Sequence, residues 1–315
     1  MPHRNTSRAL QGQSTAMSLI FDNKFAPHYG EPVDITPDVQ RITVNNPSPF
    51  TFHGTNSYLV GKDTLALIDP GPVDEAHRAT LLRAIAGRPV SHIFVSHTHR
   101  DHSPLATLLR DELGALIVAE GPHRAARALH TGEVNLLDAS ADTQFVPDII
   151  APDNSLIHGD GWALRTIHTP GHTANHAVFA LEGTGILFSA DHVMAWSTSI
   201  VAPPDGSMSD YMASLDRILE LDSRVYFPGH GGAVTRPKAF VRGLKGHRKM
   251  RERAILERVR AGDRTIAAMV SAIYRETDPR LHGAAALSVL AHLEDMVARG
   301  LVQTEGNPAI DGVYW

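Results

Sequence analysis

The chain contains no cysteine among its 315 residues, and this absence excludes disulfide bonds. Nothing in the composition therefore calls for an oxidising compartment. Apolar runs long enough to span a membrane are also lacking, as is the apolar core of an ordinary signal peptide. With 43% hydrophobic and 20% charged residues, the composition is that of an ordinary soluble globular protein. We expect a cytoplasmic protein without a membrane partner.

The first 20 residues lack acidic side chains but include Arg4 and Arg8. We interpret residues 1–25 as a disordered tail, with Met17 as an alternative start. An acid-poor, basic beginning also leaves organelle targeting open as an alternative.

Acidic and basic residues are divided unevenly along the chain. Residues 1–235 hold 15 Lys and Arg against 25 Asp and Glu, a net charge of −10, whereas residues 236–315 hold 14 against 9, a net charge of +5. The basic excess lies between Arg236 and Arg260. This change predicts one large domain over residues 26–240 and a small one over residues 244–315.

The segment His97-Thr98-His99-Arg100-Asp101-His102 is the most informative motif of the sequence. Imidazole and carboxylate groups are the ligands of zinc and similar divalent metals. Residues two apart in an extended segment point the same way, so His97 and His99 can hold one ion together. Asp101 and His102 follow where the chain turns, and they can approach a second ion. A surface loop of solvated histidines is the alternative interpretation.

Three further candidate ligands follow predicted strands in the same way. His172 comes after the alternating run 162–167, Asp191 after the apolar run 185–190, and His230 after residues 225–229. Ends of strands are rigid and the loops beyond them are accessible, which suits a preorganised metal site. The recurrence at four strand ends favours a metal site over scattered surface histidines.

Periodicity predicts the remaining elements. Strands are expected at 41–44, 55–60, 64–68, 90–95, 113–119, 155–157, 163–167, 178–181, 186–189 and 225–227, and helices at 75–86, 122–129, 211–219, 252–260, 266–275 and 287–297. Residues 301–304 and 312–315 indicate a terminal hairpin, and residues 135–153 show no clear period. Three helices followed by a hairpin are the plan of a winged helix.

The set His97, His99, Asp101, His102, His172, Asp191 and His230 resembles the ligand set of the metallo-β-lactamase superfamily. The resemblance implies an α/β fold, a four-layer αββα sandwich with two divalent metal ions at one edge of the sheets. It also implies that His97, His99 and His172 hold the first metal, that Asp101, His102 and His230 hold the second, and that Asp191 bridges them. Zinc is the first expectation, with manganese or iron as alternatives. The implied reaction is hydrolysis by a metal-bridging hydroxide, with Asp101 and Asp191 as catalytic residues.

The winged-helix-like tail makes the chain similar to the β-lactamase-like protein 2 group in particular. Supporting segments are residues 54–60, 202–206 and 291–294. The human member of that group is an endoribonuclease on single-stranded RNA, so the resemblance implies a phosphodiesterase.

Three functions remain open on the sequence. RNA hydrolysis is supported by the group resemblance and by the basic residues Lys245, Arg248, Lys249, Arg251, Arg253 and Arg258, which can equally form a solvated helix face. Hydrolysis of a small thioester, ester or lactone is favoured by the acidic catalytic half, whose field would repel a polyanion. A metal-bearing nucleic-acid-binding module is disfavoured by Glu294 and Asp295 on the presumed recognition helix. His176 and His192 are candidates for a general acid by proximity alone, and the tail suggests a homodimer or a cap on the active site.

Overall fold

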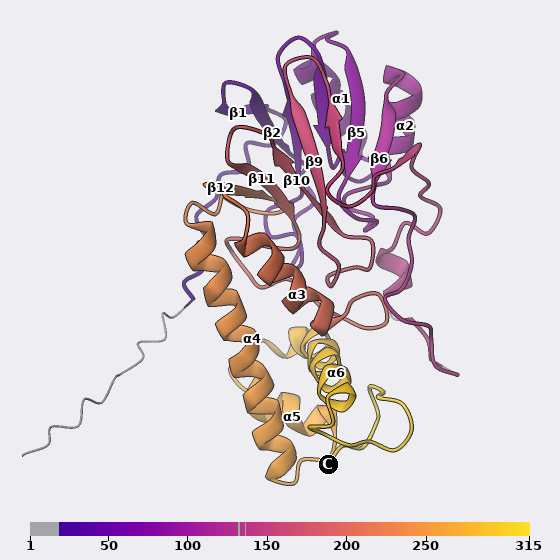
Figure 1. The fold of residues 1–315 in the computed structure, drawn as a ribbon, viewed down its shortest axis with the longest axis vertical. Coiled ribbons are helices and arrows are strands. Elements are labelled where there is room, and N and C mark those ends of the chain that lie inside the picture. The colour runs from indigo at the N-terminus through magenta and orange to yellow at the C-terminus, as the bar shows by residue number, and fades with distance from the viewer. Residues whose placement is uncertain (1–18, 132, 136) are drawn as a thin grey trace, which may run out of the picture.

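Two β-sheets form the centre of the protein in the computed structural model, which describes residues 19–131, 133–135 and 137–315 (Figure 1). The first sheet has the order β1-β2-β3-β4-β5-β6-β7 and the second the order β12-β11-β10-β9-β8. The first comprises β1 (Val33–Thr36), β2 (Val39–Thr43), β3 (Asn56–Val60), β4 (Leu65–Ile68), β5 (Val90–Val95), β6 (Leu116–Ala119) and β7 (Ile149–Ile150). The second comprises β8 (Leu156–His158), β9 (Ala163–His168), β10 (Ala177–Leu181), β11 (Ile186–Ala190) and β12 (Val225–Pro228).

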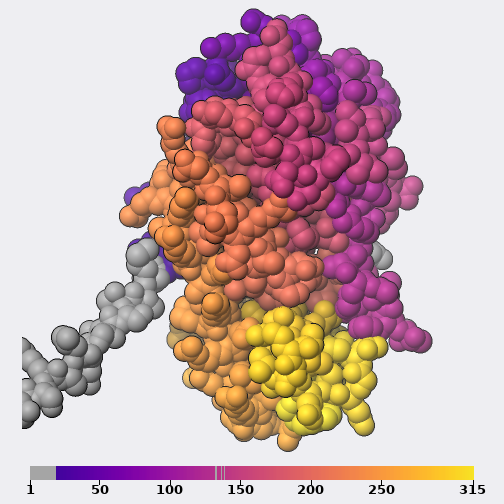
Figure 2. Space-filling model, viewed as in Figure 1, coloured from indigo at the N-terminus to yellow at the C-terminus, as the bar shows by residue number. Residues whose placement is uncertain are grey.

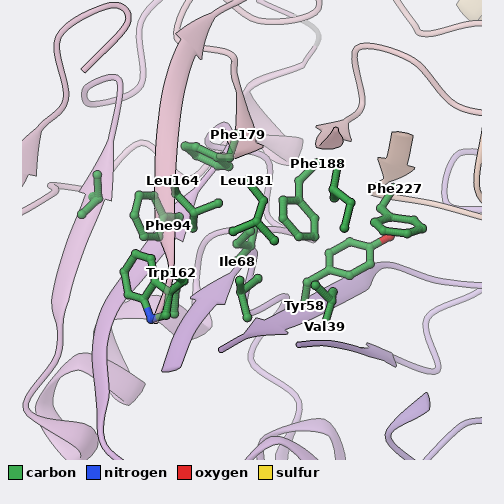
Figure 3. Packing of buried hydrophobic residues seen from close by; sticks show 14 of the residues in the cluster. Val39, Tyr58, Ile68, Phe94, Trp162, Leu164, Phe179, Leu181, Phe188 and Phe227 are labelled. Atoms are coloured by element: carbon green, nitrogen blue, oxygen red, sulfur yellow. The ribbon is translucent and has the colours of Figure 1, made fainter. Parts of the chain in front are cut away.

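The inner faces of the two sheets meet in an aromatic-rich core (Figure 3). Tyr58 on β3 lies 5.1 Å from Phe188 on β11 between ring centroids, and Phe94 on β5 lies 5.2 Å from Phe179 on β10. Successive strand residues point to opposite faces, so Leu59 packs on the other side of the first sheet. Every residue of β3 is therefore buried, including the polar Asn56 and Ser57 at its beginning.

Helices cover the outer face of each sheet. The helices α1 (Glu75–Ile85) and α2 (Leu105–Leu113) pack on the first sheet. On the second sheet lie α3 (Met208–Leu219) and the beginning of α4 (Pro237–Arg260). The order helix, sheet, sheet, helix is the predicted αββα sandwich, and the fold prediction is confirmed.

The C-terminal residues form a lobe below the sandwich (Figure 2). This lobe has a second, smaller apolar core of its own. The rest of α4 joins α5 (Ile266–Ile273) and α6 (His282–Ala298), and a short 3-10 helix at Pro279–Leu281 directly precedes α6. Another 3-10 helix, at Asp138–Ser140, belongs to the sandwich part of the chain. Thr265 caps α5 by accepting a hydrogen bond from the Ala268 amide, as its sequence position predicts. Because α4 is continuous through residue 244, the two predicted domains share one helix, and the division of the chain remains a prediction.

Three local expectations need correction. The predicted helix over 122–129 is absent, because the backbone there bonds to distant segments: Ala126 donates to Pro204, and Asn175 donates to the Pro122 carbonyl. The strand expected from Leu113 begins only at Leu116, since α2 runs to Leu113 and Gly114 ends it with a φ of 66°. The terminal hairpin is reduced to a single bridge between Thr304 and Tyr314.

The predicted disordered tail lies mostly in residues 1–18, outside the described residues. Residues 19–25, which we assigned to the same tail, instead lie against the sandwich. Asp22 donates its amide to the Ala195 carbonyl, and the ring of Phe21 meets that of Phe240 edge to face. None of the helices in the described part of the chain is long and apolar enough to cross a membrane.

Candidate metal centre

The seven predicted ligand residues converge at one edge of the sandwich. His97, His99, Asp101 and His102 follow β5, and His172, Asp191 and His230 follow β9, β11 and β12. Both sheets thus contribute strand ends to the same place. Among the described residues, they form two groups: His97, His99, His172 and Asp191, then Asp101, His102 and His230.

In the first group the side-chain donor atoms face one another closely. Nε2 of His97 lies 2.9 Å from Nδ1 of His99, and Nε2 of His172 lies 3.0 Å from the same atom. Oδ2 of Asp191 is 3.6 Å from Nε2 of His172. One donor atom from each of the four residues lies within 4.8 Å of the others.

The second group adjoins the first through Asp191. Nε2 of His102 and of His230 are 3.4 Å apart, and each lies 3.3 Å from Oδ2 of Asp101. Oδ1 of Asp191 lies 3.5 Å from the first of these nitrogens and 3.3 Å from the second. The two oxygens of Asp191 therefore face different groups, which is the geometry of a bridging carboxylate.

Oxygen acceptors behind the site fix the ring orientation of three histidines. Nδ1 of His172 donates to the Ile200 carbonyl at 2.6 Å, and Nδ1 of His230 donates to the Gly54 carbonyl at 3.2 Å. Nδ1 of His102 lies 3.0 Å from Oδ2 of Asp69. Since these oxygens can only accept, the proton sits on Nδ1 and the Nε2 lone pair is aimed at the site.

Asp69 is a functional residue that the sequence interpretation missed. It follows β4, and its carboxylate accepts hydrogen bonds from the amide and the hydroxyl of Ser96, both at 2.7 Å, as well as facing His102. The Ser96 hydroxyl in turn lies 2.9 Å from Nδ1 of His97. From the sequence, Asp69-Pro70-Gly71 indicates only the end of a strand. Its position after a buried strand, like that of the ligands, was the signal available.

Gly229 is a second residue whose importance the sequence did not reveal. A Cβ atom at this position would lie 2.5 Å from Oδ1 of Asp191 and 2.7 Å from Cε1 of His102. No side chain fits at these distances, so glycine lets β12 approach the site closely.

Burial and neighbouring charges raise the pKa of some histidines of the site and lower the pKa of others. Burial would lower the pKa of His230, but the Asp191 and Asp101 carboxylates outweigh it and raise that pKa to about 9. Burial would also lower the pKa of His102, but the same two carboxylates outweigh it and raise that pKa well above its usual value. For His99, burial and the neighbouring His172 lower the pKa to about 3. Without a cation, protons on His102 and His230 therefore balance the carboxylates.

The donor set fits divalent cations. Within the described residues, the buried Oδ1 of Asp191 makes no hydrogen bond of good geometry, and the imidazoles of His230 and His102 lie 3.3 and 3.5 Å from it. A cation that displaced their protons would satisfy this oxygen. Imidazoles with carboxylates are ligands typical of zinc, manganese and iron. His176 and His192 stand behind the site: both are fully buried, and neither lines the cavity described next.

A cavity of about 670 Å³ leads away from the site. Its lining includes the candidate ligands His99, Asp101, His172, Asp191 and His230. It also includes side chains of α4 and α6, and Tyr274, which directly follows α5. The C-terminal helices thus form a wall of the cavity that reaches the candidate metal centre. Asp101 and Asp191 are its only acidic lining residues in the described part of the chain.

Comparison with known proteins agrees with this architecture. The family model "Metallo-beta-lactamase superfamily" matches residues 50–230, and the model "Beta-lactamase associated winged helix domain" matches residues 265–311. The chain is 31% identical over 278 residues to a "Beta-lactamase-like protein 2 homolog" of Drosophila melanogaster, covering 84% of this chain and 90% of that one.

Two further relatives extend the comparison. An "Atrochrysone carboxyl ACP thioesterase" of Claviceps purpurea is 28% identical over 261 residues, covering 80% of this chain and 76% of that one. A crystal structure of a metallo-beta-lactamase family protein from Thermus thermophilus superposes with a TM-score of 0.71 at 26% identity, covering 89% of this chain and 99% of that one. The chain belongs to the metallo-β-lactamase superfamily of hydrolases and carries a C-terminal winged-helix domain.

Proposed function

We propose that this hydrolase is a two-metal phosphodiesterase that cleaves single-stranded RNA. The lining of the cavity is the observation that carries the proposal. The guanidinium groups of Arg100, Arg248 and Arg251 line it, together with the aromatic rings of Phe50 and Tyr274. Cations with aromatic rings are the chemistry that binds the phosphates and bases of a single strand.

The charge inside the cavity differs from the net negative charge of the catalytic half, which would repel RNA. A polyanion would be repelled by a uniformly acidic surface, but the cavity carries carboxylates only at the candidate metal centre among the described residues. Two metal cations would neutralise these. The field inside the cavity therefore favours an anionic substrate, even though residues 1–235 carry a net charge of −10.

In this proposal His97, His99 and His172 hold one cation, Asp101, His102 and His230 hold the other, and Asp191 bridges them. Bound divalent cations lower the pKa of water toward neutrality and polarise the phosphoryl oxygen. Asp69 and Ser96 keep His102 and His97 in the orientation that presents Nε2. Thr55 donates its hydroxyl to Oδ2 of Asp101 at 3.2 Å and so limits the positions of that carboxylate.

Hydrolysis of a thioester is the second candidate, and two observations favour it. Apolar side chains, among them Phe21, Met194 and Trp196, line the same cavity. The relative from Claviceps purpurea is named as a thioesterase. An acyl chain would use the apolar lining but would leave the arginine side chains without a role, so we place this function second.

A nucleic-acid-binding module without catalysis receives the least support. The helix α6 buries Val289, Leu290 and Leu293, and Glu294 pairs with Arg127 of the large domain at 2.6 Å. A helix packed in this way does not present a cationic face to phosphates.

A panel of substrates tests the proposal. Protein loaded with zinc or manganese should cleave single-stranded RNA and bis(p-nitrophenyl) phosphate, and it should act weakly on a thioester and a lactone. The variant Asp191→Ala should lose nearly all turnover on every substrate that the wild type hydrolyses. Such a loss would exclude a contaminating nuclease as the source of the activity. Rapid hydrolysis of the thioester, with no cleavage of RNA by the zinc- or the manganese-loaded protein, would reject the phosphodiesterase and support the thioesterase.

A further inference from the structure

The C-terminal helices build part of the cavity wall, separate from the candidate metal ligands in the sequence. His247, Arg248 and Arg251 come from α4, and Tyr274 follows α5. The basic segment of α4 is therefore not one continuous surface. Lys245 pairs with Asp216, and Lys249 and Arg253 line a separate groove with Glu252 and Glu257. Only part of the segment faces the cavity.

Arg251 has no anionic partner within the described residues, although its guanidinium lines the cavity. Its guanidinium lies over the ring of Tyr274, 4.1 Å from the centroid, and no hydrogen bond or ion pair of Arg251 exists within the described residues. Other arginines of this part of the chain are paired: Arg258 bonds Asp263 at 2.6 Å, and Arg299 bonds Glu252 at 2.6 Å. The planar donors of Arg251 remain available to a ligand.

Arg248 adds a second cation to the same end. Its side chain is 4% exposed, and it donates to the Ser199 carbonyl and, at 3.5 Å, to the Ser288 hydroxyl. Its Nε is buried without a partner, and no carboxylate neutralises it in the described part of the chain. An uncompensated buried guanidinium is costly unless an anion approaches it. His247 beside it is largely uncharged near neutral pH, because burial and the charges of Arg248 and Arg251 lower its pKa to about 4.

We infer that Arg251, supported by Arg248 and Tyr274, forms a second subsite that binds a phosphate group of the substrate away from the scissile bond. The inference rests on the proposed function, in which this group is the phosphate of a neighbouring nucleotide in the same strand. Arg251 binds the phosphate, Arg248 adds positive charge beside it, and the part of Tyr274 that lines the cavity contacts a base. The winged-helix domain thereby selects substrates longer than one phosphodiester.

Substrate length tests the subsite. A dinucleoside monophosphate contains only the scissile phosphate, whereas a short single-stranded oligoribonucleotide also offers neighbouring ones. Arg251→Met should raise KM for the oligoribonucleotide about tenfold, as expected for loss of a charge-assisted hydrogen bond. It should leave kcat/KM for the dinucleoside monophosphate and for bis(p-nitrophenyl) phosphate unchanged. Arg251→Lys keeps the charge and should recover part of the lost affinity.

Arg253→Met is the matched control, because it removes the same charge from the same helix but from the exposed groove. This variant should leave KM for the oligoribonucleotide and kcat/KM for the dinucleoside monophosphate unchanged. Equal losses in Arg251→Met and Arg253→Met, or equal losses on long and short substrates, would overturn the subsite.

Equilibrium binding separates this inference from the function on which it rests. Binding of a fluorescent single-stranded oligonucleotide should weaken in Arg251→Met and not in Arg253→Met, whether or not the strand is cleaved. Binding that depends on Arg251 without any cleavage would keep the subsite and reject the phosphodiesterase. Cleavage with the same affinity in both variants would keep the phosphodiesterase and reject the subsite.

Discussion

Asp69 shows how a residue outside the predicted ligand set organises the site. Its carboxylate joins Ser96 and His102, and through the Ser96 hydroxyl it reaches His97. One side chain thus orients a histidine in each of the two groups. Partners behind metal ligands commonly matter for affinity almost as much as the ligands themselves.

Replacing Asp69 by Ala should weaken metal binding about 10–100-fold, because the two imidazoles lose their fixed orientation. Competition with a chelator measures this affinity directly. Asp74→Ala is a suitable control: Asp74 caps α1, so its loss should cost about 1 kcal/mol of stability without changing metal affinity. Equal metal affinity in wild type and Asp69→Ala would contradict the role given to Asp69.

The pH dependence of the metal-free protein follows from the pKa shifts in the site. The pKa of His230 is raised from 6.5 to about 9, so its stabilising contribution is complete below pH 6.5 and is lost as pH rises through 9. The pKa of Asp101 is lowered below 3.8, so its contribution is present above that pH and is lost on further acidification. The raised pKa of His230 therefore favours the folded state on the acid side of pH 9, whereas the lowered pKa of His99, about 3, disfavours it as pH falls below 6.5.

Thermal unfolding of the metal-free protein should show a lower midpoint at pH 9 than at pH 7.5, because histidines with lowered pKa values are almost entirely neutral in the folded and the unfolded protein over this range. Metal affinity should change in the opposite direction, since a cation must displace the protons on His102 and His230. An unfolding midpoint that rises between pH 7.5 and pH 9 in the metal-free protein would contradict the assigned charges.

At the scale of elements, the loop after β11 connects the winged-helix domain to the metal centre. Arg248 of α4 donates to the Ser199 carbonyl, and the adjacent Ile200 carbonyl accepts from Nδ1 of His172. Tyr211 of α3 holds the same loop through its hydroxyl, 3.2 Å from the Ser199 hydroxyl. A helix of the C-terminal lobe therefore stabilises the position of a candidate ligand.

Arg248→Met should lower both the stability of the protein and its affinity for metal, since the Ser199 carbonyl loses its partner at a cost of about 1–3 kcal/mol. Metal titration of the folded variant separates the two effects. Arg253→Met, on the exposed side of the helix, should change neither. A destabilised Arg248→Met protein with wild-type metal affinity would show that the loop does not depend on this contact.

The elements that the sequence predicted well are those whose signals are local. Period-two and buried runs located β3, β5 and β11, and the turns after them placed His97, His99 and Asp191 at one edge. The segment 122–129 was predicted wrongly because its apolar spacing resembles a helix, whereas its backbone bonds to Pro204 and Asn175, far away in sequence. A tail that caps the active site was one of two expectations from the sequence. Which side chains of α4 line the cavity was not predictable, because it depends on how α4 docks rather than on its own pattern.

At the scale of the whole molecule, the sandwich and the C-terminal lobe share apolar surface. Val241 and Leu244 of α4 and Ala291 of α6 belong to the same buried cluster as α3. The lobe also closes the cavity that begins at the candidate metal centre. This shared packing makes the lobe part of the site rather than a separate appendage.

Truncation after residue 243 should therefore damage more than RNA binding. Loss of Leu244 and Ala291 exposes the apolar face of α3, so size-exclusion chromatography should show aggregation or an altered oligomeric state. The predicted homodimer is checked on the full-length chain in the same experiment. A monomeric truncated core that cleaves oligoribonucleotides at the wild-type rate would contradict this account.

Metal content measured by elemental mass spectrometry tests the central claim, a two-metal site bridged by Asp191, most directly. Carefully purified wild-type protein should contain close to two equivalents of zinc, manganese or iron per chain, because seven donor residues form two adjoining groups. Asp191→Ala should retain at most about one equivalent and lose nearly all turnover. A chain that is fully active without metal, or an Asp191→Ala variant that keeps both metals and wild-type rates, would contradict the account.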